Sequence, residues 1–324
     1  MLTALLSEKI AQYGPISFRE FQETALYHPQ YGYYRRQRDP FGIGGDFYTA
    51  EQIQPVFGLL IARVVEQLAA RLGLPSGQLP VIELGAGRQE MRPHFEQWNY
   101  QAVESGRGEL PQNLRGIVFA NEFLDALPVH LVRRQQHSFV EVLVGCTNGT
   151  FHFVDGPAVH DDLAKYLTKH ASHVKEGVLM EAHLDAIAWL DRLDAALEQG
   201  FLLFIDYGFT EAERIRFPQG TLMSYFRHQA DEQVLHKPGD RDITAHVPFT
   251  MIINEAKERG FHLESFETLA QMLLTAGERD QFAAVLTGAT EMECQKRRGQ
   301  LKTLLFGMGE TFRVLLFSRG VSRV

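Results

Sequence analysis

The chain has 324 residues, of which 45% are hydrophobic and 22% are charged, a composition typical of a folded globular protein. Its formal net charge of -8 argues against general binding to nucleic acids or anionic membranes, because both need a basic surface. The two cysteines are too few for a disulfide framework or a cysteine-rich zinc site. No apolar run reaches the ~20 residues of a membrane span and the N-terminus lacks signal-peptide features, so the sequence predicts a cytoplasmic protein without a membrane span.

Residues 1–75 are predicted to form an N-terminal helical cap and an aromatic lid loop. Ser17 can cap a helix in which Glu20 stands at the third position. The loop at 27–48 carries seven aromatic residues among several glycines and prolines, and long ordered loops usually have a function. Apolar residues then recur at helical spacing over 56–72.

Residues 76–324 are predicted to form a Rossmann-like core of the α/β class, with a mainly parallel sheet. Short apolar runs alternate with helical segments, and several of these runs lead directly into a polar residue, as parallel strands do where their carboxyl ends carry chemistry. The runs are Val81–Leu84, Ala102–Val103, Ile117–Ala120 and Leu202–Ile205. Two insertions are expected, at 130–175, which contains a β-hairpin, and at 210–247, where an additional α-helical insertion is predicted.

The strongest local pattern is the glycine loop that follows the apolar run Val81–Leu84, together with a carboxylate, Glu104, directly after the next run, Ala102–Val103. Glycines let the backbone approach a ligand closely, and the amides that follow would face it at a helix start. Glu104 can accept both hydroxyls of a ribose, whereas Glu90 stands where a dinucleotide motif needs a third glycine and would repel a pyrophosphate. This favours S-adenosylmethionine, a sulfonium without phosphate, over NAD; an ordinary strand-to-helix turn is the structural alternative. The cofactor-binding candidates are Glu83, Gly85, Ala86, Gly87 and Glu104.

A second acidic pattern follows the run that ends at Ala120. Glu122 and Asp125 are three residues apart, so on a first helical turn their carboxylates would share a face. Asn121 could cap that helix and direct its carbonyl into the cleft. The alternative is that the two acids only complement the helix dipole.

The chain resembles the MidA family of class I S-adenosylmethionine-dependent methyltransferases, whose members include a mitochondrial complex I assembly methyltransferase. The resemblance extends over nearly the whole length and consists of separated blocks in one order. These blocks include Tyr27-His28-Pro29, Gly45-Asp46-Phe47-Tyr48-Thr49-Ala50, Asn121 to Val129, Ile205-Asp206-Tyr207-Gly208, Asp242 to Val247 and Gly307 to Val314.

The resemblance implies methyl transfer from S-adenosylmethionine to a protein substrate, with arginine as the acceptor in the eukaryotic branch. On this view Glu122 and Asp125 would be catalytic residues that grip a guanidinium, with Asn121 near the transferred methyl. Additional cofactor-binding residues, in the lid loop, would be Asp46, Tyr48 and Thr49, and the substrate-binding residues would be Asp206 and Tyr207. The alternative is that this loop only packs against the rest of the protein and does not cover the cofactor.

Departures from the family pattern leave other functions open. The family's Gly-Arg-Gly ending is Gly87-Arg88-Gln89 here, and the segment 88–116 is shortened. A catalytically degenerate relative that binds a partner protein as an assembly factor is therefore the second hypothesis. A nicotinamide oxidoreductase is disfavoured by Glu90. The 13 histidines form no helical ligand pair, so no metal site is predicted.

Overall fold

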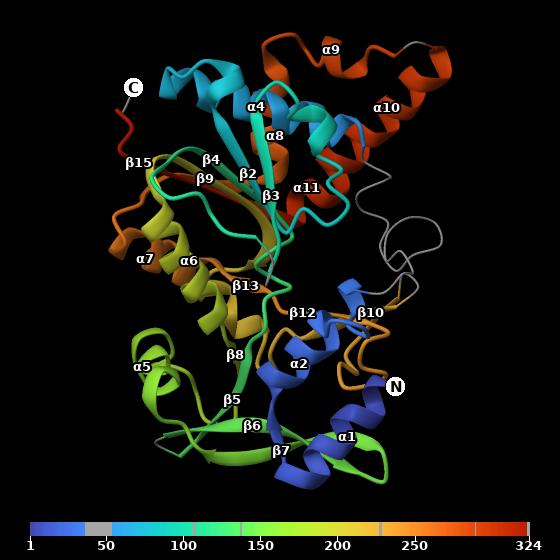
Figure 1. Cartoon of the computed structure of the whole chain (residues 1–324), viewed down its shortest axis with the longest axis vertical. Helices are drawn as coiled ribbons and strands as arrows, with labels where there is room; N and C mark the ends of the chain where they lie inside the picture. Colours follow the sequence, from blue (N-terminus) through green and yellow to red (C-terminus); the bar gives the residue numbers. More distant parts are fainter. Residues whose placement is uncertain (36–53, 106–107, 137, 227–228, 289, 323–324) are drawn as a thin grey trace. The chain divides into compact units, whose positions relative to one another are not determined.

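The computed structural model describes residues 1–35, 54–105, 108–136, 138–226, 229–288 and 290–322 (Figure 1). The chain divides into two compact units built from interleaved segments. Unit 1 comprises Met1–Tyr48, Asp125–Ala188 and Phe209–Met251, and unit 2 comprises Thr49–Leu124, Trp189–Gly208 and Ile252–Val324. This differs from the division expected at residue 75, because the helix at 56–72 packs in the core of unit 2. The two expected insertions both lie within unit 1.

Unit 2 contains the main sheet and the helices packed on it. Its strands are β2 (Pro80–Leu84), β3 (Asn99–Val103), β4 (Leu114–Asn121), β9 (Leu197–Phe209), β14 (His262–Thr268) and β15 (Phe312–Arg319). Its helices are α4 (Val56–Leu72), α8 (Leu269–Glu278), α9 (Ala283–Leu286), α10 (Glu291–Thr303) and α11 (Gly309–Thr311), with short 3-10 helices at Ser76–Gln78 and Arg92–His94 and a π-helical turn at Leu304–Met308. Two more helices, α6 (Leu184–Ala196) and α7 (Phe249–Glu258), run from unit 1 into unit 2.

The main sheet has the order β14-β15-β9-β4-β2-β3. Strands β3, β2, β4 and β9 are parallel, and β15 is inserted antiparallel between β9 and β14. This mainly parallel sheet confirms the predicted α/β class I methyltransferase fold. The register aligns Leu84 with both Val103 and Ala120, and Asn121 with Ile205, so these parallel strands end at one edge of the sheet.

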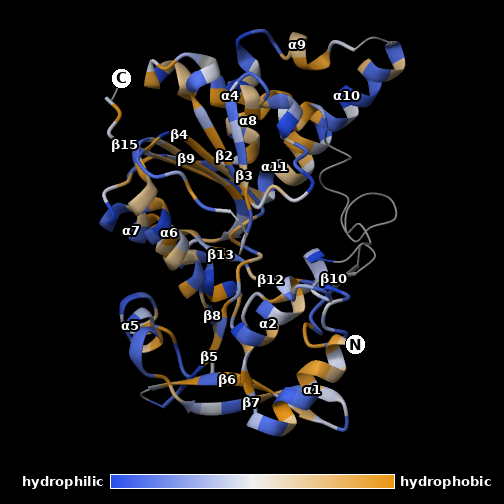
Figure 2. Ribbon diagram, in the orientation of Figure 1, coloured by the Kyte–Doolittle hydropathy of each residue, from blue (hydrophilic) through white to orange (hydrophobic). Residues whose placement is uncertain are grey.

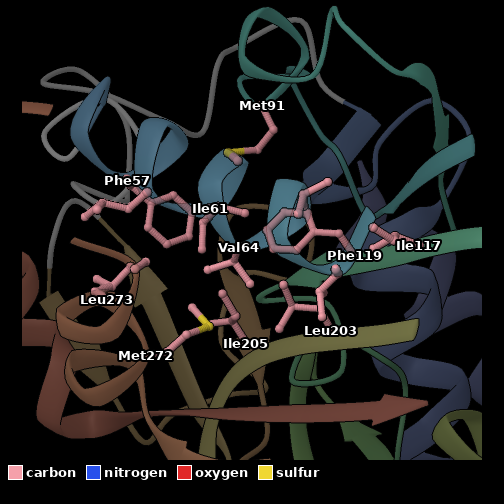
Figure 3. Close-up of a cluster of buried hydrophobic side chains, with 14 of the residues drawn as sticks. Phe57, Ile61, Val64, Met91, Ile117, Phe119, Leu203, Ile205, Met272 and Leu273 are labelled. Carbon is pink, nitrogen blue, oxygen red and sulfur yellow. The ribbon is translucent and has the colours of Figure 1, made fainter. Parts of the chain in front are cut away.

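The core of unit 2 forms where α4 and α8 cover one face of this sheet (Figures 1 and 3). Phe57, Ile61 and Val64 recur every three or four residues along α4, so one stripe of the helix faces the strands. They pack with apolar side chains of β4 and β9, such as Phe119 and Leu203, that are completely buried. Figure 2 shows the contrast with α10, whose residues are mostly hydrophilic.

Unit 1 is built on an antiparallel sheet of order β1-β6-β5-β8, with β7 paired to β6. Its strands are β1 (Ile16–Ser17), β5 (His130–Gln135), β6 (Ser138–Thr147), β7 (Thr150–Ala158) and β8 (Leu179–Ala182), with β10 (Met223–Phe226), β11 (Gln229–Asp231), β12 (Asp242–Thr244) and β13 (Val247–Pro248) further along the chain. Its helices are α1 (Leu2–Tyr13), α2 (Phe18–Tyr27) and α5 (Asp161–His170), with 3-10 helices at Tyr33–Arg35 and Glu211–Arg216.

Two local predictions for unit 1 are confirmed and one differs. The side chain of Ser17 accepts a hydrogen bond from the Glu20 amide at the start of α2, and the predicted hairpin is β6–β7, drawn green in Figure 1. The segment 210–247 contains a 3-10 helix and the small antiparallel sheet β11-β10-β12 in place of the predicted α-helix. Pro218 and Gly220 prevent a continuous helix in this segment, and its residues lack the periodicity of an amphipathic helix.

Within the described part of the chain, none of the helices combines the length and the apolarity required to cross a bilayer.

Candidate functional site at the carboxyl edge of the main sheet

The glycine loop after β2 has a backbone that requires glycine at its first position. Gly85 has a φ of +67°, and its N–H donates to the carbonyl of Val103 at 2.9 Å. A Cβ built on Gly85 would lie 2.6 Å from Cδ2 of Phe123. The Phe123 ring is itself fixed, because it is buried and packs edge-on against Trp189 at a centroid distance of 4.9 Å. Gly85 therefore serves both the backbone conformation and the close approach of the loop after β4.

Glu104 follows β3 and is bonded to the glycine loop. The N–H of Gly87 donates to Oε1 of Glu104 at 2.8 Å. Gly87 also has a positive φ, of +52°, and is exposed, whereas Ala86 is buried. The predicted helix start is absent here: turns follow Gly87 and lead to the short 3-10 helix at Arg92–His94, in which Pro93 prevents a regular helix.

Replacing Glu104 tests its predicted ribose-binding role. Glu104→Ala is expected to weaken the affinity for S-adenosylhomocysteine by about 1–3 kcal/mol, because hydrogen-bonding groups lose their partner. Glu104→Gln keeps an oxygen that can accept the Gly87 N–H but loses the charge, so its affinity should fall less. Titration calorimetry of both variants and the wild type measures this. An unchanged affinity in Glu104→Ala would remove Glu104 from cofactor binding.

Glu83 is a buried carboxylic acid beside this loop. Its side chain is 5% exposed, and Oε2 accepts a hydrogen bond from the Tyr100 hydroxyl at 2.6 Å. The pKa of Glu83 is raised to about 8. Burial is the main cause and the nearby carboxylates of Glu104 and Glu90 add to the rise, while the hydrogen bond from Tyr100 opposes it. Burial likewise raises the pKa of Tyr100, and the neighbouring Glu83 adds to the effect.

This set of donors and acceptors fits S-adenosylmethionine. The carboxyl groups that lie close together at the glycine loop favour a ligand with cationic groups, and S-adenosylmethionine carries both a sulfonium and an ammonium. The same carboxylates disfavour the pyrophosphate of a dinucleotide. Hydroxyl groups of a ribose match the acceptor oxygens of a carboxylate such as Glu104.

The pKa of Glu83 predicts how stability depends on pH. Between the ordinary pKa of 4.5 and the folded-state pKa of about 8, the folded protein holds a proton that the unfolded chain has lost. Its stability should therefore fall as the pH rises through this window, by at most about 1.4 kcal/mol per pH unit. Urea unfolding between pH 5 and 8 should show this loss in the wild type and in Glu96→Gln, an exposed control, and a smaller loss in Glu83→Gln. Parallel pH profiles for all three proteins would contradict the assignment.

The loop after β4 does not form the predicted helix. Asn121 is the last residue of β4, paired with Ile205, and Glu122 has a φ of +50°, which a right-handed helix cannot accommodate. The Asn121 side-chain amide donates to Oε1 of Glu122 at 3.2 Å. The prediction that Asn121 caps a helix on which Glu122 and Asp125 share a face was therefore wrong. Asp125 belongs to unit 1, where it is buried and its carbonyl accepts the N–H of Ala245.

Asp206 and Tyr207 lie near the end of β9. Asp206 is 2% exposed, and its two oxygens accept the backbone N–H groups of Leu124 at 3.0 Å and Tyr207 at 2.9 Å. This arrangement is typical of a loop anchor. Tyr207 is partly buried and packs edge-on against Phe312 at a centroid distance of 5.5 Å. A substrate-binding role for Tyr207 stays a prediction.

Three of the predicted cofactor-binding residues, Asp46, Tyr48 and Thr49, lie outside the described residues. The structure also reveals two contacts that the sequence did not predict. Tyr100 reaches Glu83 from the neighbouring strand, and Phe123 fills the space beside Gly85. The parallel pairing of β2 with β3 and β4 brings these residues together, so the local sequence carries no signal for the two contacts.

In the described ranges, histidine, cysteine, aspartate and glutamate side chains nowhere gather in a group of three or more that could hold a metal ion.

Two solved structures resemble the whole chain. One is a protein from Burkholderia thailandensis bound to S-adenosyl-homocysteine, 31% identical, with a TM-score of 0.87 and coverage of 100% of this chain and 93% of that one. The other is a native crystal structure of a protein of the same superfamily from the same organism, 30% identical, with a TM-score of 0.80 and coverage of 100% of this chain and 92% of that one.

Curated relatives are similar over most of the chain. The protein arginine methyltransferase NDUFAF7 of Danio rerio is 27% identical and the match covers 76% of this chain and 70% of that protein; the Drosophila melanogaster homolog is 24% identical, with 80% and 70% covered. Both are named as mitochondrial proteins, which contradicts the cytoplasmic location expected from the sequence. That prediction was wrong because few cysteines and a lack of apolar spans do not distinguish the two compartments.

A family model described as an S-adenosyl-L-methionine-dependent methyltransferase matches residues 89–267, more than half of the chain. The sheet order of this chain agrees with this match, and so does the S-adenosyl-homocysteine in the Burkholderia structure, since it is the product that S-adenosylmethionine leaves after methyl transfer. The chain therefore belongs to the MidA family of class I S-adenosylmethionine-dependent methyltransferases.

Proposed function

We propose that this methyltransferase acts on a protein and transfers the methyl group to an arginine side chain. Relatives similar over about three quarters of the chain are named protein arginine methyltransferases, at 23–27% identity. The position of Glu122 is the observation that supports the proposal best. Its carboxylate follows the end of β4 at the carboxyl edge of the main sheet, and its backbone is left-handed.

The chemistry of arginine explains why a fixed carboxylate matters. A guanidinium is planar and stays protonated in proteins, so its nitrogen becomes nucleophilic only when the group is held and oriented. A carboxylate can accept two of its N–H groups at once and leave the remaining nitrogen facing the methyl donor. When bound, S-adenosylmethionine supplies an electrophilic methyl group on a sulfonium.

Glu122 has the properties that such a clamp needs. Its backbone N–H donates to the carbonyl of Ile205 at 3.0 Å, and its carboxylate is contacted by the Asn121 amide. The side chain is only partly buried, so it can reach a ligand. Backbone strain of this kind persists at functional sites where the surrounding structure enforces it. We assign Glu122 to the guanidinium and Asn121 to orienting Glu122; the role of Asp125 stays a prediction.

Methyl transfer to protein can be tested without knowing the substrate. The purified full chain is incubated with [methyl-³H]S-adenosylmethionine and an extract of host cells from which this protein has been deleted. The labelled protein is then hydrolysed to amino acids. Label recovered as methylated arginine supports the proposal, and label recovered on another amino acid overturns the assignment to arginine. Absence of labelling in a chain that binds S-adenosylhomocysteine would favour the non-catalytic assembly factor.

A further inference from the structure

The loop that carries Glu122 is held from both sides by one strand. The N–H of Glu122 donates to the carbonyl of Ile205, and the N–H of Leu124 donates to Oδ2 of Asp206 at 3.0 Å. Oδ1 of the same carboxylate accepts the N–H of Tyr207 at 2.9 Å, which fixes its orientation on β9. Two consecutive residues of β9 thus bind the loop immediately before and after Phe123.

The conformation held in this way is a strained one. Glutamate rarely adopts a φ of +50°, because its Cβ crowds the backbone in the left-handed region. Such a conformation persists only where the neighbouring contacts over-determine it. Phe123 packs against Trp189, and the hydrogen bond from Leu124 to Asp206 adds an anchor on the carboxyl side of the strained residue.

We infer that Asp206 is a positioning residue for methyl transfer: its buried carboxylate holds the 121–124 loop so that Glu122 keeps its left-handed backbone and its side-chain orientation. This inference rests on the proposed role of Glu122. It replaces the substrate contact expected from the sequence, because a carboxylate that is 2% exposed and bonded to two backbone amides has little surface left for a substrate.

A charged, two-oxygen acceptor is what this position needs. Hydrogen bonds from amides to an ionised carboxylate are stronger than those to a neutral acceptor. Asparagine offers one oxygen and one NH₂ group, so in Asp206→Asn one of the two amides would face a donor. Asp206→Glu keeps the charge but displaces the oxygens by one methylene. Asp191, which is exposed on α6 and paired with Arg259, provides a matched control in Asp191→Asn.

The test combines these variants with Glu122→Gln in a double-mutant cycle. Initial rates of tritium transfer from [methyl-³H]S-adenosylmethionine to extract protein are measured at saturating cofactor, with thermal unfolding as a check of folding. Asp206→Asn is expected to lower the rate on the order of 10- to 100-fold, and Asp206→Glu less, with the affinity for S-adenosylhomocysteine within about twofold of wild type. In the Glu122→Gln background, Asp206→Asn should cause no further loss, because it acts through Glu122.

Hydrogen exchange gives a second readout that needs no activity. Asp206→Asn should accelerate exchange in peptides covering residues 122–125, while peptides covering 85–89 stay protected as in the wild type and in Asp191→Asn. Either unchanged exchange at 122–125 or multiplicative rate losses in the double variant would overturn the inference. If Glu122→Gln is fully active, the proposed role of Glu122 fails, and accelerated exchange then shows only that Asp206 anchors the loop.

Discussion

Gly85→Ala is expected to destabilise the protein far more than the same substitution at another glycine with a similar positive φ. Any side chain at a φ of +67° costs about 1–2 kcal/mol, and overpacking against the Phe123 ring adds roughly 1–3 kcal/mol. The ring cannot swing aside, since Trp189 packs against it. Denaturant unfolding should therefore show a loss of roughly 2–5 kcal/mol.

Gly73 provides the matched control for this prediction. It has a φ of +64°, ends α4, and a Cβ there would meet nothing within 4 Å. Gly73→Ala should therefore lose only the backbone contribution, about 1–2 kcal/mol, and bind S-adenosylhomocysteine as the wild type does. Gly85→Ala should in addition bind it at least about tenfold more weakly, because its loop is displaced. Equal losses of stability in the two variants would show that the contact with Phe123 is not restrictive.

Glu122→Gly is expected to abolish most methyl transfer while leaving the fold intact. Glycine adopts a φ of +50° freely, so the relief of about 1–2 kcal/mol of strain offsets the ~0.5–1 kcal/mol that glycine costs in chain entropy. The carboxylate is lost, and we expect the methyl-transfer rate to fall on the order of 100-fold or more, the typical result of removing one electrostatic contact from a transition state. The measurements are tritium transfer to extract protein and denaturant unfolding.

The control for Glu122 is another carboxylate outside the loop. Glu96→Gln alters an exposed acid before β3 and should change neither the rate nor the stability. Glu122→Gln, which keeps the side-chain shape, should lose activity as Glu122→Gly does if the charge is what grips the substrate. Full activity in Glu122→Gly would exclude Glu122 from the transfer step. A large loss of stability in Glu122→Gly would show instead that the Glu122 side chain is needed to stabilise the loop.

Helices, strands and caps that depend on short stretches of sequence were predictable. The apolar runs became β2, β4 and β9, the periodic segment at 56–72 became α4, and Ser17 caps α2, because each depends on residues within a few positions of one another. The glycines of the loop after β2 belong to this class as well, since a left-handed turn after a strand selects glycine locally.

Only the tertiary structure decided the geometry of the 121–124 loop. Acidic residues three positions apart predict a helix turn, but hydrogen bonds to Ile205 and Asp206, some 80 residues further along the chain, hold Glu122 in a left-handed conformation instead. The sequence by itself determined the fold class, the family and the cofactor. The pairing of Glu83 with Tyr100 and the anchoring by Asp206 arise from neighbouring strands whose register no local pattern encodes.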